Sequence, residues 1–331
     1  MKVVTLGEVM LRLTPEGYGR FVQADRLLTA YGGAEANVAA LLAQFGAHAV
    51  FVTKLPAHEL GLAAAGALRR YGTDLSYVLY GSGRLGVYYL EKGASQRGGK
   101  VIYDREGSAF ARSLPDEYDW DGIFGGADWF HFTGITPALG GNCLHIVQRA
   151  CREAKSYGAT VSCDINYRAS LWTCEAAREA LTALMADVDV CISNADQVTQ
   201  VFGLRAQGEG NAHDAALAGM LAERFGLRGV ALTRRRSVTA SENFFSGMYY
   251  DGKAYFSREY DMLIVDRVGG GDAFAGGLIW ALGNQEAPQA AVEFAAAAGC
   301  FKHSVEGDVC LASEQEVRAV ANGMTDGRVS R

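Results

Sequence analysis

Short apolar runs alternate with helix-like segments along most of this chain, and this alternation limits the folds open to it more than any other feature. Runs rich in Val, Ile, Phe and Thr, several of them apolar on both faces, predict strands at residues 2–7, 49–55, 129–134, 160–166, 188–194 and 229–234. Apolar residues at helical spacing predict helices at residues 34–45, 59–71, 143–157, 174–186 and 211–225. The pattern predicts an α/β fold with a mostly parallel central sheet that is flanked by helices on both faces.

Two regions interrupt this rhythm. Residues 84–92 and 100–105 alternate apolar and polar side chains as half-exposed strands do, and residues 8–28 look extended and irregular. We therefore expect a small β-sheet lid over the main sheet, built from segments at about 8–30 and 80–108.

The chain shows no linker, low-complexity tract or internal repeat, so a single domain over residues 1–331 is expected. A further hairpin is predicted at residues 247–257, where Asp251 and Gly252 supply the turn.

The charge balance and the cysteines exclude several classes of partner. Lys and Arg number 31 against 37 Asp and Glu, which leaves no broad basic face for nucleic acid or for an anionic membrane. The amino terminus lacks a secretory signal, and the longest apolar stretches fall short of the ~20 residues that cross a bilayer. Seven cysteines without paired spacing and six scattered histidines give no disulfide framework and no metal site made of protein side chains. These features predict a cytoplasmic protein.

The segment IVDRVGGGDAFAGGLIWAL, residues 264–282, places three glycines directly before a carboxylate at the expected start of a helix. Gly269, Gly270 and Gly271 leave the helix amino terminus free of side chains, so backbone N–H groups and the helix dipole can hold an anion there. A carboxylate beside bound phosphate is repulsive unless it accepts a proton from the attacking group. The pattern therefore predicts phosphoryl transfer to a hydroxyl, with Asp272 as the base.

The glycine run does not match two other phosphate-binding loops. Gly277 and Leu278 stand where a P-loop needs Lys and Ser or Thr, and Phe274 stands where a Rossmann loop needs glycine. A purely structural interpretation, in which Asp272 is an N-cap behind a tight turn, remains open from these residues alone.

The full string VDRVGGGDAFAGG resembles the second signature of the ribokinase-like (PfkB) carbohydrate kinases, D-T-x-G-A-G-D-x-F, with Arg267 and Gly270 as departures. The string YGGAEANVAALLAQFG, residues 31–46, resembles the first signature of the same family. The resemblance covers essentially the whole chain. It implies a ribokinase-like three-layer sandwich with a β lid, a kinase that uses ATP and Mg2+, and a catalytic group formed by Asp272 with Gly269, Gly270 and Gly271.

The middle of the chain, residues 86–111 and 163–172, looks like the branch of the family that phosphorylates 2-keto-3-deoxygluconate. That likeness implies ATP-dependent transfer to the carbon-6 hydroxyl, with 2-keto-3-deoxy-6-phosphogluconate and ADP as products. The opening GEVMLRLTP carries Arg12 where ribose and fructose kinases usually carry an Asp that grips sugar hydroxyls. The implied substrate-binding residues are Gly33, Asn37, Tyr89, Tyr103, Arg105, Arg168, Asp272 and Asp308.

Arg105 and Arg168 suit a sugar acid, because a guanidinium fork can hold a carboxylate through two parallel hydrogen bonds. Each proposed contact has a plainer interpretation: Tyr89 and Tyr103 could be lid packing, and Arg168 could pair with Asp164.

The family resemblance also implies which residues bind ATP. The implied ATP-binding residues are Asn166, Arg168, Asn194, Thr233, Arg234, Gly269, Gly271 and Lys302. Gln197 replaces the family's usual Glu near the magnesium and phosphate site, and the ATP loop has no glycine before Gly247. The resemblance also makes a monovalent cation possible, bound by backbone carbonyls near Asp266 and residues 302–308.

The same residues are compatible with two other functions. One is a related kinase for 2-keto-3-deoxygalactonate, fructose or a nucleoside, and another is a sugar or nucleotide sensor that kept the fold without activity. Because exposed lid edges of this kind often pair, we expect a homodimer or a higher homo-oligomer through the lid.

Overall fold

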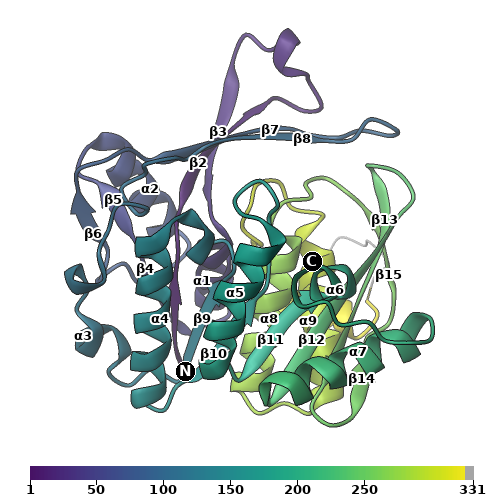
Figure 1. Cartoon of the computed structure of the whole chain (residues 1–331). Coiled ribbons are helices and arrows are strands. Elements are labelled where there is room, and N and C mark those ends of the chain that lie inside the picture. Colours follow the sequence, from purple (N-terminus) through teal and green to yellow (C-terminus); the bar gives the residue numbers. More distant parts are fainter. Residues whose placement is uncertain (325–331) are drawn as a thin grey trace.

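The computed structural model describes residues 1–324, which build a nine-stranded sheet between two layers of helices, with a smaller sheet across one end (Figure 1). The strand order is β14-β13-β12-β11-β10-β9-β1-β4, and β15 pairs with β13. These strands are β1 (Lys2–Leu6), β4 (His48–Val52), β9 (Trp129–Thr133), β10 (Thr160–Asp164), β11 (Val190–Asn194), β12 (Gly229–Ser237), β13 (Glu242–Tyr250), β14 (Ala254–Phe256) and β15 (Tyr260–Leu263).

Six neighbouring strands of the sheet pair in parallel, in the order β4, β1, β9, β10, β11 and β12. Strands β13, β14 and β15 add an antiparallel edge. Four of the six predicted parallel strands are confirmed within one or two residues, while the run predicted at 49–55 divides into β4, which ends at Val52, and the first residues of β5 (Lys54–Pro56) in a separate sheet. β12 runs past its predicted end to Ser237, because it pairs with β13 as far as Asn243. The predicted hairpin turn is also present, with Gly252 at φ +99° between β13 and β14.

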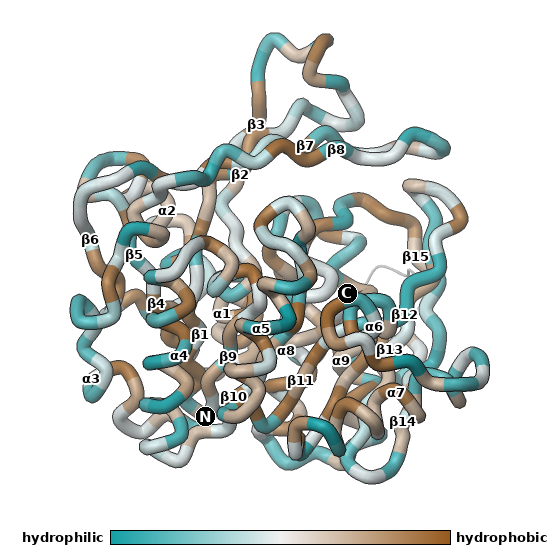
Figure 2. Tube along the Cα trace, viewed as in Figure 1, coloured by the Kyte–Doolittle hydropathy of each residue, from teal (hydrophilic) through white to brown (hydrophobic). Residues whose placement is uncertain are grey.

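Helices cover both faces of this sheet, and each layer has its own apolar core. Val3 packs into one core and Val4 into the other, because successive side chains of β1 point to opposite faces. The first layer holds α1 (Ala34–Gln44), α2 (Glu59–Arg69), α8 (Gly270–Gly283), α9 (Pro288–Lys302) and α10 (Glu314–Ala321). The second holds α3 (Trp120–Phe124), α4 (Gly141–Ser156), α5 (Cys174–Leu184), α6 (Ala195–Phe202) and α7 (Gly210–Phe225). The three-layer sandwich is therefore confirmed, and Figure 2 shows apolar residues concentrated along its central strands.

The lid is a separate four-stranded sheet in the order β3-β2-β7-β8 (Figure 1). Its strands are β2 (Met10–Pro15), β3 (Leu27–Gly32), β7 (Gly86–Glu91) and β8 (Lys100–Asp104). They lie in the two predicted lid segments, except that β3 continues past residue 30 to Gly32. A short pair, β5 (Lys54–Pro56) with β6 (Leu79–Gly81), lies between them in the chain, and single 3-10 turns occur at η1 (Phe21–Gln23), η2 (Pro115–Glu117), η3 (Pro137–Leu139) and η4 (Met185–Asp187).

No helix among residues 1–324 is both long enough and apolar enough to cross a membrane.

Candidate active site

A cavity of about 850 Å3 opens between the lid and the carboxyl ends of the parallel strands. Its body side is lined by residues that end or follow these strands, including Glu8 after β1, Asp164 in β10, Asn194 in β11 and Thr233 in β12. In open α/β sheets the crevice outside the carboxyl ends of the strands is where ligands bind. The start of α8 completes the cavity.

The helix mouth, residues 269–272, has the geometry of an anion site. Gly269 is the N-cap residue of α8, at φ +86°, and a Cβ there would lie 1.9 Å from the carbonyl oxygen of Asp308. The amide of Ala273 donates to the Gly269 carbonyl at 2.8 Å, so the amides of Gly270, Gly271 and Asp272 precede the first helical hydrogen bond. These amides and the helix dipole favour negative charge at this point.

Asp272 is the third residue of α8, so the alternative in which it is the N-cap is wrong. Its Oδ2 accepts a hydrogen bond from Asn37 Nδ2 at 2.7 Å, and the Oδ1 of Asn37 accepts from the Gly33 amide at 3.4 Å. Burial raises the pKa of Asp272 to about 6, while the Asn37 hydrogen bond opposes that rise. Within residues 1–324, Oδ1 of Asp272 has no side-chain partner, so one oxygen is held and the other is available.

A second carboxylate, Asp164, lies close to the first. Burial raises the pKa of Asp164 to about 7, the charge of Asp272 adds to the rise, and Arg168 opposes it. Asp164 Oδ1 accepts from the amide of Asn166 at 3.0 Å, and Asn166 has φ +38°. Sequence reasoning named Arg168 and Asn166 but missed Asp164 as a cavity residue. Its position at the carboxyl end of a predicted strand was the available signal.

On the lid, the structure places Tyr88 and Tyr103 at the cavity but not Tyr89. Tyr88 is 4% exposed and donates a hydrogen bond to Asp308. Tyr89 points to the other face of β7, where its ring packs edge-on against Phe21 with 6.3 Å between centroids. The expectation for Tyr89 is therefore corrected to Tyr88, because neighbouring residues of a strand face opposite sides of the sheet.

Arg105 lines the cavity as expected, but it is already paired. Its Nε donates to Glu8 Oε2 at 2.8 Å, and its Nη2 contacts the same oxygen. Nη1 has no hydrogen-bond partner in the described part of the chain. Glu8 thus holds one edge of the guanidinium and leaves the outer edge free.

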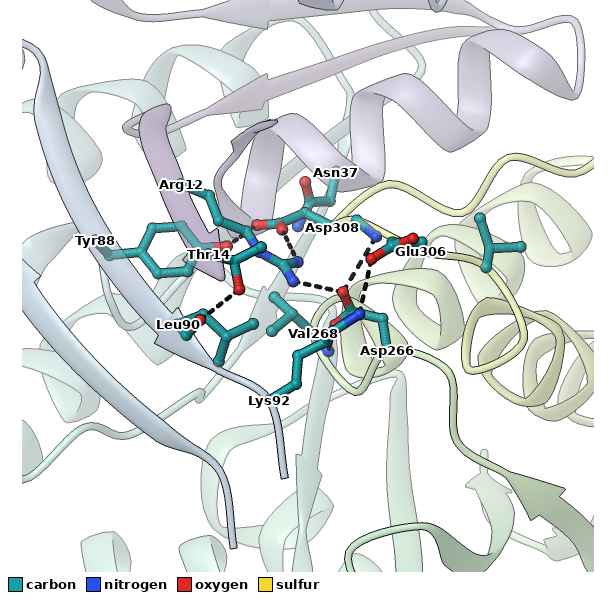
Figure 3. A network of polar contacts seen from close by, with 12 residues as sticks. Arg12, Thr14, Asn37, Tyr88, Leu90, Lys92, Asp266, Val268, Glu306 and Asp308 are labelled. Atoms are coloured by element: carbon teal, nitrogen blue, oxygen red, sulfur yellow. Dashed lines mark hydrogen bonds and ion pairs between the residues drawn. The ribbon is translucent and has the colours of Figure 1, made fainter. Parts of the chain in front are cut away.

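Arg12 does not face the cavity. Its side chain is 1% exposed, and it donates to Asp266 Oδ2 at 2.5 Å and to Asp308 Oδ1 at 2.8 Å. Figure 3 shows Arg12 between these two carboxylates, with Tyr88 reaching Asp308 from the lid. Arg12 therefore fastens the lid to the body of the protein.

On the nucleotide side, seven of the eight expected residues line the cavity: Asn166, Arg168, Asn194, Thr233, Arg234, Gly269 and Gly271. Asn194 is the N-cap of α6 and accepts from the Gln197 amide at 2.9 Å. Arg234 donates to Asp214 Oδ2 at 2.6 Å.

Lys302 is the exception among the expected nucleotide residues. It is 0% exposed and does not line the cavity. As the last residue of α9, which packs against α8, it extends behind the helix mouth instead of into the space in front of it. The expectation that Lys302 contacts ATP is therefore corrected.

Two further arginines line the cavity that sequence reasoning did not place there, Arg235 and Arg267. Arg235 Nη2 contacts His303 Nε2 at 2.7 Å, and the other ring nitrogen of His303 lies 2.6 Å from the Gly299 carbonyl. Because arginine can only donate, this ring is neutral with Nε2 as the acceptor, and burial lowers the pKa of His303 to about 3. Arg235 lies in the run TRRRS, residues 233–237, and Arg267 is a departure from the family signature, so these were the signals for this basic wall.

A mostly parallel sheet between helix layers, a β lid, and a base at a glycine-lined helix mouth define a ribokinase-like kinase fold. The chain matches the pfkB family of carbohydrate kinases over residues 1–311. It is 33% identical over 323 residues to a 2-dehydro-3-deoxygalactonokinase from Haloferax volcanii, with 97% of each chain covered. It is 28% identical over 313 residues to a 2-dehydro-3-deoxygluconokinase from Thermoproteus tenax, covering 93% of this chain and 90% of that protein.

A crystal structure of 2-dehydro-3-deoxygluconokinase from Thermotoga maritima has a TM-score of 0.96 to this chain at 46% identity, with 98% of both chains covered. The chain therefore belongs to the pfkB family of carbohydrate kinases.

Proposed function

We propose that this chain phosphorylates 2-keto-3-deoxygluconate, also called 2-dehydro-3-deoxygluconate, at its carbon-6 hydroxyl with ATP as the donor. One observation carries the proposal: Asp272 lies beside the amides of the helix mouth, with one carboxylate oxygen held by Asn37 and the other free of side-chain partners among residues 1–324. A base next to an anion-binding backbone is what phosphoryl transfer to an alcohol requires. The Thermotoga maritima relative, 46% identical, is named for this activity.

The chemistry assigns a role to each group at the helix mouth. The sugar hydroxyl gives its proton to Asp272 while its oxygen bonds to the γ-phosphorus of ATP, and the bond from that phosphorus to the β-phosphate oxygen breaks to release ADP. With its pKa raised to about 6, Asp272 is ionised near neutral pH yet basic enough to accept the proton. The amides of Gly270 and Gly271 stabilise the charge on the transferring group.

The residues around this site fit a magnesium ion that arrives with the nucleotide. Within residues 1–324 no group of three or more His, Cys, Asp or Glu side chains is placed to hold a metal. Mg2+ in kinases commonly keeps several waters and binds through substrate phosphates and one or two carboxylates. Asp164 and Asn194 line the cavity and would meet that hydrated ion, which would neutralise phosphate charge when bound.

Substrate specificity is proposed to depend on Arg105 and Arg168. Both line the cavity, Arg105 from the lid side and Arg168 after β10. The free outer edge of Arg105 can pair with the carboxylate of a sugar acid in two charge-assisted hydrogen bonds. A neutral sugar offers no such partner.

A substrate panel tests the proposal. Purified protein with ATP and Mg2+ is assayed for ADP release on 2-keto-3-deoxygluconate, 2-keto-3-deoxygalactonate, fructose and ribose. We expect kcat/KM for the keto acids to exceed that for the neutral sugars by roughly 100-fold, the size expected for losing two hydrogen bonds to a charged group. Better turnover of fructose or ribose than of either keto acid would contradict the proposed specificity.

2-Keto-3-deoxygalactonate is the second candidate substrate, because the Haloferax volcanii relative at 33% identity is named for it. The two acids differ only in the configuration at carbon 4, so the same panel ranks them. A higher kcat/KM for the galactonate would assign the chain to that activity and leave the roles of Asp272 and Arg105 intact.

The lid suggests how the subunits assemble. β8 is an edge strand of the lid sheet, and it exposes Val101, Ile102 and Tyr103, each more than 40% exposed. An open edge with apolar side chains favours pairing with a second strand, so we propose a homodimer through the lid. We also propose a cytoplasmic location, because the reaction consumes ATP and the seven cysteines are unpaired. Light scattering on purified protein tests the dimer.

A further inference from the structure

Lys302 places a positive charge inside the protein, directly behind the helix mouth. Its Nζ donates to the carbonyl oxygen of Val305 at 2.9 Å and to that of Asp266 at 3.4 Å. Its stem passes under Gly269, because a Cβ on Gly269 would lie 3.2 Å from Lys302 Cε. Backbone carbonyl oxygens hold this ammonium in the way they hold hard metal cations.

The charges buried around Lys302 balance. Two cations, Arg12 and Lys302, lie with two carboxylates, Asp266 and Asp308, and all four residues are at most 4% exposed. Burial lowers the pKa of Lys302, and the charges of Asp266 and Asp308 oppose that shift. Removing the ammonium would leave a net negative charge with unpaired carbonyl oxygens in a buried site, which is costly.

The family resemblance suggests a monovalent cation bound by backbone carbonyls near Asp266 and residues 302–308. The described residues do not fit an added ion there, because the Lys302 ammonium already takes the carbonyls of Asp266 and Val305. We infer that Lys302 is a built-in cation that takes the place of an added monovalent ion, so that the protein needs neither K+ nor Na+.

In this role Lys302 is a positioning residue. It joins the segment that leads into the helix mouth, at Asp266, to the loop that follows α9, at Val305. The side chain of Asp266 adds to this tie by accepting from the Gly307 amide at 3.2 Å. The carbonyl of Asp308, which a Cβ on Gly269 would strike, belongs to the same loop. A cation at this point therefore holds the backbone of the helix mouth in place against the loop that follows α9.

The first arm of the test uses the unmodified protein. Melting temperature, kcat and KM are measured in tetramethylammonium chloride and in KCl or NaCl at matched ionic strength. Between these salts we expect kcat and KM to change by less than about twofold and the melting temperature by less than about one degree. Such changes are smaller than the coupling that a bound ligand ordinarily produces. A K+-specific rise in melting temperature or in kcat would overturn the inference.

The second arm removes the charge. Lys302→Met keeps the stem and should lower melting temperature and kcat in tetramethylammonium, and K+ should restore both. The expected recovery is on the order of tenfold in kcat and a few degrees in melting temperature. Lys92→Met is the matched control, since Lys92 also reaches the 302–308 loop, through Glu306 at 2.7 Å, but donates to no backbone carbonyl of the described residues. It should show no K+ response.

If Lys302→Met does not fold, Lys302→Ala replaces it, because the short side chain leaves both carbonyls free for an added ion. A folded Lys302→Ala protein whose melting temperature ignores K+ would overturn the inference. The thermal readout needs no substrate, so it fails or succeeds independently of the proposed kinase substrate.

Discussion

The helix mouth and the lid form opposite walls of one cavity, yet the chain specifies them differently. At the helix mouth a contiguous run, Gly269–Gly271 followed by Asp272, sets both the backbone and the base. On the lid, the cavity residues come from strands separated in sequence, and β7 offers Tyr88 to the cavity and Tyr89 to the other face. The reaction chemistry is thus local in the sequence, while recognition of the substrate depends on strand register.

A buried network joins the two walls. Arg12 in lid strand β2 pairs with Asp266 and Asp308 of the body, and Tyr88 in β7 bonds to Asp308 as well (Figure 3). The lid is therefore fastened to the same loop that supports the helix mouth. Variants in the helix mouth, in the buried network and on the lid should therefore change different properties: kcat, the free energy of unfolding and KM.

The largest effect is expected from removing the base on the helix-mouth wall. Asp272→Asn keeps the shape and the contact to Asn37 but cannot accept the proton, so kcat should fall by roughly two to four orders of magnitude. ATP binding, measured by calorimetry, should be nearly unchanged. Near-normal turnover would show that the carboxylate has only a structural role.

Cutting the network between the walls should cost stability. Arg12→Met leaves the carboxylates of Asp266 and Asp308 without their buried partner, which should lower the free energy of unfolding by about 3–5 kcal/mol. Denaturant titration measures this loss. Arg26→Met is the control, because Arg26 pairs with Glu16 on the surface at 83% and 68% side-chain exposure and should cost under about 1 kcal/mol. Equal losses in the two variants would contradict the anchoring role.

On the lid wall, Arg105→Lys keeps a positive charge beside Glu8 but loses the guanidinium fork. KM for the keto acid should rise about tenfold with little change in kcat, since the contact exists both before and during the reaction. Steady-state kinetics on the keto acid and on fructose make the comparison. The same proportional loss on the neutral sugar would argue against carboxylate recognition.

The pH profile should report the two carboxylates of the cavity. Asp272 must be ionised to act as a base, and its pKa is raised to about 6, so kcat/KM should fall as the pH drops through that range. Asp164, with its pKa raised to about 7, titrates together with it. The charge of Asp272 raises the pKa of Asp164, so Asp272→Asn should lower the pKa of the Asp164 carboxyl, as followed by NMR titration. A higher pKa for Asp164 in that variant would contradict this coupling.

The smallest effects should distinguish the two neighbouring tyrosines of β7. Tyr88→Phe removes the hydrogen bond to buried Asp308 and should lower the free energy of unfolding by about 1 kcal/mol, with a modest rise in KM. Tyr89→Phe, on the other face, should leave both within error. A larger KM effect from Tyr89→Phe would mean that the register of β7 differs from the one described.

Much of the body could be predicted from the sequence, because its signals are local. Apolar strand runs, helical spacing and the glycines before Asp272 each depend on a few adjacent residues, and the structure confirms the strands, the helices and the lid segments. β15 and the first half of β13 were missed, since Glu242–Ser246 and Tyr260–Leu263 pair with strands and with each other only in the folded chain.

The site was less predictable wherever a side chain's partner lies far away in the chain. Lys302 is the last residue of an apolar helix and looks like a basic residue near phosphate, but its depth behind the helix mouth depends on the packing of α9 on α8. Arg12 likewise finds its partners 254 and 296 residues away. Asp164 was overlooked because a lone carboxylate at a strand end has no distinctive neighbours in the sequence.

A crystal structure with 2-keto-3-deoxygluconate and a non-hydrolysable ATP analogue would test whether Asp272 and the helix mouth act together. We predict that the carbon-6 oxygen lies within about 2.6–3.2 Å of the free carboxylate oxygen of Asp272, with the γ-phosphate at the amides of Gly270 and Gly271. A sugar whose hydroxyl lies far from Asp272, with no phosphate at the helix mouth, would contradict it.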